Sequence, residues 1–162
     1  MFKHLFAVDP GDANNGFCYF KYDTDKKVAD VRIMEVVDGG GLEGRLKLIW
    51  GIHETKPDAD ITFVIENFRI DQHVRNKVFQ WSEVITVRNI GKVEMVAKWL
   101  EAKLVIQEPT ILTMARKWSP IKINKGHIRD DHSAMLHGIH YMMNAKWFPT
   151  PDSVTFFGQD RM

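Results

Sequence analysis

The chain has 162 residues, 44% of them hydrophobic and 27% charged, which is typical of one soluble globular domain and unlike a disordered protein. The formal net charge is +1, so any surface that binds a polyanion has to be local. The single cysteine, Cys18, excludes an internal disulfide and a zinc site built on thiolates, and no apolar run approaches the roughly 18 residues of a membrane helix. We therefore expect a compact protein of the cytoplasm with no secretory signal and no membrane contact.

Three strands are expected in the first part of the chain. Lys3–Val8 is an apolar run that ends abruptly at Asp9-Pro10-Gly11, a turn sequence. The runs Phe17–Tyr22 and Val28–Val37 follow after polar turns. Because the connections are short, these strands are expected to form an antiparallel meander.

A helix and a buried strand are expected next. Apolar residues recur at helical spacing over Gly41–His53, which predicts an amphipathic helix. Ile61–Ile65 is uninterruptedly apolar and is reached through that helix, so it is expected to lie parallel to the first strand with both faces buried. The polar and basic segment 67–81 is interpreted as a loop.

The second half predicts helices around one further strand. Ser82 is a plausible N-cap for a long helix that runs to Ala102, and Lys103–Ile106 reads as a fifth strand. A short helix over Thr110–Trp118 and a basic loop then lead to a last helix, Arg129–Asn144.

This order of elements predicts an α/β fold with a mixed five-stranded sheet, three antiparallel strands followed by parallel ones, flanked by helices. We expect one domain over residues 1–146 and a C-terminal tail over residues 147–162, which shows no periodicity. The aromatic residues of the tail indicate that it packs against a surface, for which a partner subunit is one candidate.

Acidic residues stand at the ends of predicted elements. Asp9 and Glu66 each follow an apolar strand, and Asp130 and Asp131 open the last helix. Each has an ordinary explanation: a turn before proline for Asp9, a salt bridge to Arg69 for Glu66, and the helix dipole for the aspartates. Taken together, clustered carboxylates with few histidine or cysteine partners suit hard cations such as Mg²⁺ or Mn²⁺.

The last helix presents two stripes that indicate how it packs. Asp130, Ala134 and Gly138 form a stripe of small side chains, and an apolar stripe runs beside it from Asp131. Whichever stripe faces the sheet carries an aspartate to the edge of the same cleft.

Four stretches resemble a known family in order and spacing. They are LFAVDPGDANNGF (Leu5–Phe17), FVIENF (Phe63–Phe68), the helix from Val87 through IGKVEMVAKWL (Ile90–Leu100), and EPTILTMARKW followed by RDDHSAMLHGIHY (Arg129–Tyr141). The chain is similar to the RNase H-like superfamily and, within it, to the RuvC-type Holliday junction resolvases, including those encoded by bacteriophages.

The resemblance implies a catalytic metal site. Asp9 and Glu66 match the first two ligand positions, and Asp130 matches the first ligand position of the last helix. Ser133 stands where that helix has its second acidic or histidine ligand, so Asp131 either replaces the missing carboxylate or the site binds one ion more weakly; His132 is a further candidate. The implied catalytic and metal-ligating residues are thus Asp9, Glu66, Asp130 and Asp131, holding two Mg²⁺ ions that Mn²⁺ can replace.

Basic residues near both acidic segments are candidates for contacting DNA phosphates. One group leads into the last helix and the other follows Glu66; the residues are Arg116, Lys117, Lys122 and Lys125, and Arg69, Arg75 and Lys77. A solvated charged loop is the ordinary explanation for any one of them. In the second group, Phe68 or Phe79 is a candidate wedge against an unstacked base, and core packing explains Phe68 equally well.

The resemblance also implies a homodimer that resolves four-way junctions by paired cuts leaving 5′-phosphates and 3′-hydroxyls. Pairing would use the long helix, with Trp99 as an anchor, whereas Val93, Val96, Ala97 and Leu100 are explained equally well as the chain's own core. The alternatives are a relative that prefers flaps, forks or RNA–DNA hybrids, and a catalytically impaired junction-binding protein, which Ser133 favours. A phage-encoded protein would act in the host cytoplasm.

Overall fold

The computed structural model describes residues 1–67, 81–123, 126, 128–147 and 153–156. The elements in chain order are β1 (Phe2–Asp9), β2 (Asn15–Asp23), β3 (Val28–Val37), α1 (Gly39–Thr55), β4 (Asp60–Glu66), α2 (Trp81–Trp99), β5 (Lys103–Gln107), the 3₁₀ turn η2 (Pro109–Ile111), α3 (Leu112–Ala115), the 3₁₀ turn η3 (Arg116–Trp118), α4 (Asp130–Asn144) and β6 (Val154–Phe156).

The strands form one mixed sheet in the order β5-β4-β1-β2-β3-β6. β1, β2 and β3 make the expected antiparallel meander, β4 runs parallel to β1, and β5 runs parallel to β4. The five predicted strands are confirmed. A sixth, β6, pairs in parallel with β3 inside the segment where no regular structure was expected, because three residues are too short to show an alternating pattern.

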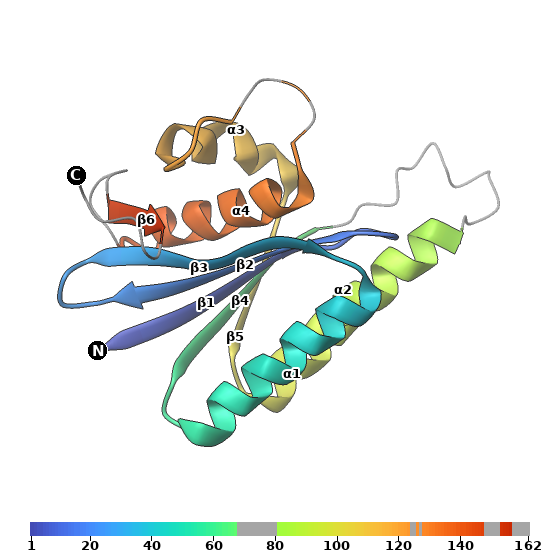
Figure 1. Cartoon of the computed structure of the whole chain (residues 1–162), viewed down its shortest axis with the longest axis horizontal. Coiled ribbons are helices and arrows are strands. Elements are labelled where there is room, and N and C mark those ends of the chain that lie inside the picture. Colours follow the sequence, from blue (N-terminus) through green and yellow to red (C-terminus); the bar gives the residue numbers. More distant parts are fainter. Residues whose placement is uncertain (68–80, 124–125, 127, 148–152, 157–162) are drawn as a thin grey trace.

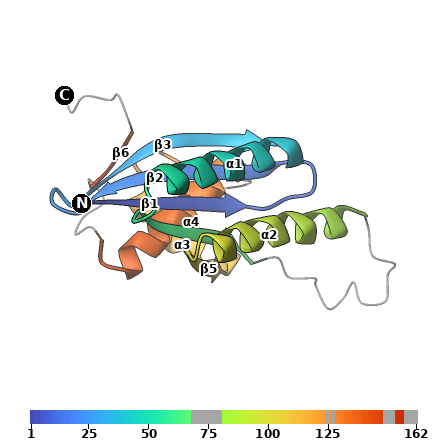
Figure 2. The same cartoon turned by 90° about the horizontal axis from the view of Figure 1, so that it is seen from below.

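Helices cover both faces of this sheet. Figure 1 shows α4 and α3 on one face and α1 and α2 on the other. Seen from the second side, α1 and α2 lie next to each other across the strands (Figure 2). The mixed α/β architecture with helices on both faces is therefore as predicted.

The alternation of side chains along the central strands supplies a core to each face. In β1, Leu5 and Ala7 belong to the cluster under α4, whereas Phe6 and Val8 belong to the cluster under α1 and α2. β4 is buried along its whole apolar run, as its uninterrupted sequence predicts.

Two glycines allow α4 to lie unusually close to the sheet. A Cβ on Gly138 would stand 2.4 Å from the Phe20 ring, and a Cβ on Gly16 would stand 1.9 Å from the Asp130 carbonyl oxygen. Gly16 therefore lets the first turn of α4 lie directly against β2.

Several element boundaries differ from the predicted ones. α1 begins at Gly39, two residues early, since the Asp38 side chain accepts a hydrogen bond from the Gly41 amide and caps it. α2 begins at Trp81, before the predicted cap Ser82, and the chain leaves it through Glu101, whose φ is 51°. The short helix predicted over Thr110–Trp118 is the succession η2, α3 and η3.

The described part of the tail packs onto the same chain. The Trp147 ring lies 5.0 Å from Tyr22 and 5.3 Å from Tyr141, between ring centroids, and the Lys3 ammonium lies over it.

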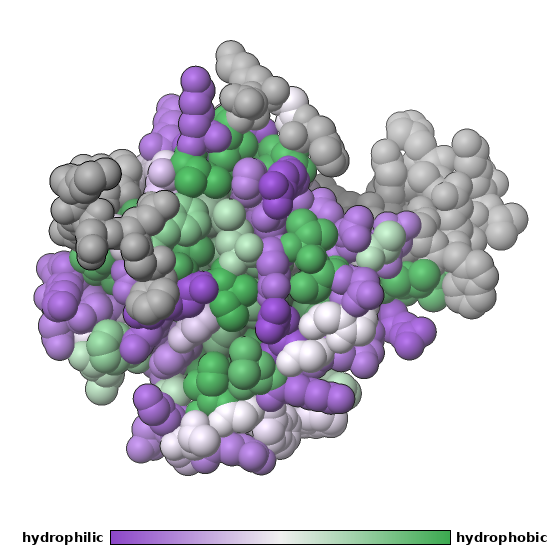
Figure 3. Space-filling model, viewed as in Figure 1, coloured by the Kyte–Doolittle hydropathy of each residue, from purple (hydrophilic) through white to green (hydrophobic). Residues whose placement is uncertain are grey.

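Hydrophilic and hydrophobic residues interleave on the face shown in Figure 3. In the ranges given above, no helix combines the length and apolarity needed to cross a membrane.

Candidate active site

The carboxyl ends of three parallel strands place polar side chains side by side. The registers of β1 with β4 and of β4 with β5 pair Val8 with Ile65 and Glu66 with Gln107, so Asp9, Glu66 and Gln107 end neighbouring strands. Asp9, Glu66 and Gln107 come two residues after Ala7, Val64 and Val105, which lie in or against the core under α4. Because side chains alternate along a strand, all three point toward the face that α4 covers. This edge is where ligand sites of open α/β sheets are found.

The first two turns of α4 lie over this edge. The Ser133 hydroxyl donates to Glu66 Oε2 over 3.2 Å, and His137 Nε2 lies 2.7 Å from the same oxygen. Asp130, Ser133 and His137 are spaced so that they share one side of the helix. Of the two stripes between which the sequence did not decide, both are buried beyond Asp130: Ala134 and Gly138 pack on the sheet, and the stripe of Asp131, Met135 and Ile139 is buried beside them.

Asp9 carries the signature of a crowded carboxylate site. Its pKa is raised from 3.8 to about 7, first by burial, then by the charge of Glu66 and, to a smaller degree, by that of Asp130, whereas the polar Ser133 side chain nearby lowers it. These influences show that the structure brings Asp9, Glu66 and Asp130 together, with Ser133 among them. Burial and neighbouring carboxylates both disfavour the ionised form.

These residues suit a divalent cation by their chemistry. Three carboxylates at one partly buried edge are the donors that Mg²⁺ and Mn²⁺ take, and a cation there would offset the repulsion that raises the Asp9 pKa. Among the described residues, no three His, Cys, Asp or Glu side chains already stand at coordinating distances from one common point.

Asp131 lies apart from that group. Its side chain is 2% exposed and receives two hydrogen bonds from Arg129, at 3.1 and 2.9 Å, together with one from the His132 amide. Its charge contributes to the raised pKa of the buried Cys18 thiol, which places it on the β2 side of the helix. The structure therefore pairs Asp131 with Arg129 and directs Asp130 toward Asp9.

The turn after Asp9 is tied to α2. Asn89 Nδ2 donates to the Gly11 carbonyl and to Asn15 Oδ1, over 3.0 and 3.1 Å, and the Gly11 amide donates to the same Asn15 oxygen. Both asparagines are fully buried, so the turn is held by side chains that water does not reach.

The candidate DNA-binding residues fall into two sets. Lys117 and Lys122 are exposed on the segment that leads into α4, and Arg116 is partly buried. The others, Arg69, Arg75, Lys77 and Lys125, lie outside the described residues, as do Phe68 and Phe79.

Sequence reasoning missed His137 and Gln107. His137 is fully buried between Glu66 and Gln107, and its Nδ1 lies 2.9 Å from Gln107 Oε1. The available signal was its spacing, seven residues after Asp130 and four after Ser133 on the same helix side. For Gln107 the signal was a polar residue that ends a strand beside Glu66.

Comparison with known proteins gives the fold. No family model and no curated protein sequence matches the chain. Among solved structures, RuvC of Thermus thermophilus in complex with a Holliday junction substrate is similar at a TM-score of 0.60 and 14% identity, over 89% of this chain and 95% of RuvC. The fowlpox virus resolvase in complex with Holliday junction DNA is similar at a TM-score of 0.50 and 13% identity, over 90% of this chain and 99% of the resolvase. The resemblance seen in the sequence is confirmed at the level of the fold: this chain has the RNase H-like fold of the RuvC-type Holliday junction resolvases.

Proposed function

We propose that this protein is a divalent-metal-dependent endonuclease that cuts branched DNA, with the four-way Holliday junction as its preferred substrate. The observation that carries the proposal is the convergence of Asp9, Glu66 and Asp130 beneath α4. The fold supports it, because both of the solved neighbours described above are bound to junction DNA.

The proposed ligands of two Mg²⁺ ions, replaceable by Mn²⁺, are Asp9, Glu66 and Asp130. When bound, such ions lower the pKa of the attacking water and stabilise charge on the leaving oxygen. The carboxylates would hold the ions and orient the water in line with the scissile P–O3′ bond, whose cleavage leaves a 5′-phosphate and a 3′-hydroxyl. Asp131 is assigned to Arg129 as a stabilising pair rather than to the metal.

Contacts to the DNA backbone would come from basic residues on the segment that leads into α4. Lys117 and Lys122 are exposed on that segment, and Arg116 is partly buried. Contacts to phosphates position a duplex without reading its sequence, and each is screened by salt. Arg69, Arg75, Lys77 and Lys125 remain candidates for the same role.

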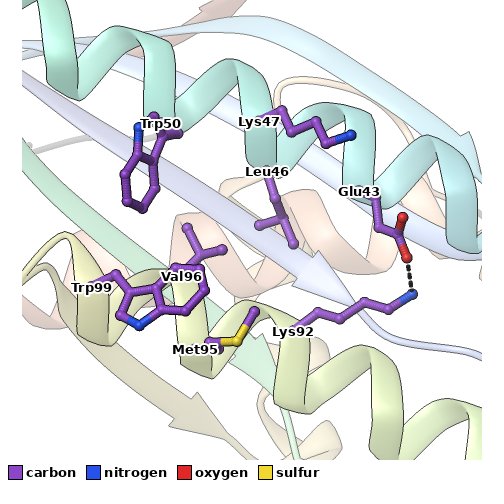
Figure 4. A pocket seen from close by; sticks show the side chains of 8 residues that line it. All are labelled: Glu43, Leu46, Lys47, Trp50, Lys92, Met95, Val96 and Trp99. Atoms are coloured by element: carbon purple, nitrogen blue, oxygen red, sulfur yellow. Dashed lines mark ion pairs between the residues drawn. The ribbon is translucent and has the colours of Figure 1, made fainter.

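A homodimer would match the near two-fold symmetry of a four-way junction. Val93, Ala97 and Leu100 are buried in the chain's own core, which leaves the outer side of α2 for a partner. On that side Trp99 is 59% exposed and lies edge-on to Trp50, 5.9 Å away between ring centroids. The two rings face the apolar groove between α1 and α2 that Figure 4 shows, which the Glu43–Lys92 ion pair closes at one end.

The test is cleavage of a labelled four-way junction in Mg²⁺, beside linear duplex, flap, fork and RNA–DNA hybrid controls. We expect paired symmetric nicks from the wild type. Glu66→Gln and Asp130→Asn should each lose roughly 10²–10³-fold in rate, the usual cost of one lost electrostatic contact in a transition state. Asp131→Asn is the matched control and should keep the cleavage rate while losing about 1–3 kcal/mol of stability with its charged hydrogen bonds.

Other outcomes would replace the proposal. Tight junction binding without cleavage in Mg²⁺ or Mn²⁺ would indicate a binding protein whose chemistry is impaired at Ser133. Cleavage confined to flaps, forks or hybrids would keep the chemistry and change the substrate.

A further inference from the structure

His137 is a fully buried imidazole with both ring nitrogens engaged. Nε2 lies 2.7 Å from Glu66 Oε2, and Nδ1 lies 2.9 Å from Gln107 Oε1. The ring therefore bridges the ends of two adjacent strands, β4 and β5, from a helix that crosses them. A buried polar ring needs hydrogen-bond partners. One of the two partners of His137 is Glu66, a member of the carboxylate cluster, so the ring is in direct contact with the candidate site.

The hydrogen-bonded chain Gln107–His137–Glu66, called the bridge below, is fixed by the packing of each of its three residues. Leu136, Gly138 and Ile139 around His137 are fully buried, and the close contact of Gly138 with Phe20 fixes the helix over the sheet. Gln107 is paired with Glu66 in the sheet, and its carbonyl accepts from the Asn67 amide over 2.6 Å. The imidazole thus cannot move without the helix or the strand moving with it.

Both contacts to Glu66 reach the same carboxylate oxygen. Ser133 Oγ and His137 Nε2 both bond to Oε2, so the carboxylate cannot turn over without breaking both bonds. Oε1 is the oxygen that these two side chains leave for another partner. A carboxylate fixed in this way presents one defined oxygen beside Asp9 and Asp130.

We propose that His137, held by Gln107, is a positioning residue that orients Glu66 as a ligand of the catalytic cation. The inference rests on the proposed function. Residues that hydrogen-bond a metal ligand from behind fix its geometry, and their loss typically weakens metal affinity or activity by 10–100-fold. His137 does not touch the cation or the substrate.

The test measures metal binding without DNA. Mn²⁺ is titrated into the wild type and variants, and free Mn²⁺ is followed by electron paramagnetic resonance. His137→Ala should bind Mn²⁺ about 10–100-fold more weakly, and Gln107→Ala should weaken it in the same direction. The matched control is His140→Ala, since His140 is only partly buried on the same helix and contacts Asn144.

The cleavage assay supplies a second readout. The Mg²⁺ concentration for half-maximal cleavage should rise by the same factor in His137→Ala, while affinity for the junction in Ca²⁺ stays unchanged. Saturating Mg²⁺ should restore part of the rate, which a merely misfolded variant would not show. His137→Gln, which keeps a donor amide, should recover part of the Mn²⁺ affinity.

Two results would overturn the inference in different ways. If His137→Ala and Gln107→Ala bind Mn²⁺ like the wild type and differ only in melting temperature, the bridge is structural. If the wild type binds Mn²⁺ no better than Glu66→Gln, the metal site itself is refuted, and with it both this inference and the proposed function. Should His137→Ala not fold, Gln107→Ala decides by the same criteria.

Discussion

The carboxyl of Asp9 lies where burial and two neighbouring carboxylates all oppose its ionisation, and its pKa is raised to about 7. In the unfolded chain the same group ionises near 3.8. Because the folded state holds the proton more tightly, the contribution of Asp9 to stability is present at acid pH and is lost as the pH rises through about 7. The ionised Asp9 carboxylate therefore destabilises the metal-free native fold at neutral and alkaline pH.

The metal-free protein should lose stability relative to Asp9→Asn as the pH rises from 3.8 to about 7. Above that range the wild type should be the less stable by up to about 4 kcal/mol, since each unit of pKa shift corresponds to ~1.4 kcal/mol. Urea unfolding across the pH range measures the difference. Adding Mg²⁺ at alkaline pH should stabilise the wild type and leave Asp9→Asn nearly unchanged; a wild type that gains stability relative to the variant on alkalisation would contradict the crowding of Asp9.

Among the elements, α4 depends most visibly on close backbone approach. Its first turn rests on Gly16 of β2, and a Cβ there would collide with the Asp130 carbonyl, which cannot swing away as a side chain can. The position of Asp130, and hence its distance from Asp9, depends on the absence of a side chain at residue 16.

Gly16→Ala should push the start of α4 off β2 and reduce both stability, by about 1–3 kcal/mol, and any metal-dependent cleavage. Gly44→Ala is the control, because a Cβ on Gly44 meets nothing within 4 Å in an exposed part of α1. That change should stabilise the protein by about 0.5–1 kcal/mol through helix propensity. Chemical denaturation measures the free energy of unfolding of both variants. If Gly16→Ala were as stable as Gly44→Ala, α4 would have room to shift away from β2.

Strands with strong apolar runs were predictable, and element ends were less so. β3 matches its predicted bounds, since a polar turn and an aspartate before a glycine run delimit it. β6 was not predictable because its pairing with β3 depends on tertiary contact rather than on its three residues. The loop predicted over residues 67–81 lies outside the described residues except for Asn67 and Trp81.

For the molecule as a whole, the exposed side of α2 is the surface on which a second copy is proposed to sit. Trp99→Glu should place a charge in that contact and weaken dimerisation at least about 30-fold, the equivalent of a hot-spot loss of about 2 kcal/mol. Light scattering after gel filtration measures the change against concentration. Met114→Glu, at an exposed residue on the opposite face of the sheet, is the control and should leave the mass unchanged. A wild type that is monomeric at every concentration would refute the dimer.

The carboxylates of the candidate site were foreseeable from the sequence because strand ends and helix starts gather at one sheet edge. The partition between Asp130 and Asp131 was not, since adjacent helix residues differ by about 100° in direction and only tertiary packing decides which one faces the strands. The His137–Gln107 bridge was equally hidden, because a buried histidine in a helix looks like a core residue until its neighbours are known. A bacteriophage origin stays a prediction.

The contacts that close the site span long stretches of chain. Glu66 meets Ser133 and His137 across separations of 67 and 71 residues, and Asn15 meets Asn89 across 74. Contacts of such separation form late, because a large loop entropy must be overcome before they are made. During synthesis β1 and β4 emerge well before α4, so a nascent chain carries Asp9 and Glu66 without Asp130 or the bridge behind Glu66. The proposed nuclease would therefore have an incomplete carboxylate site until its last helix docks.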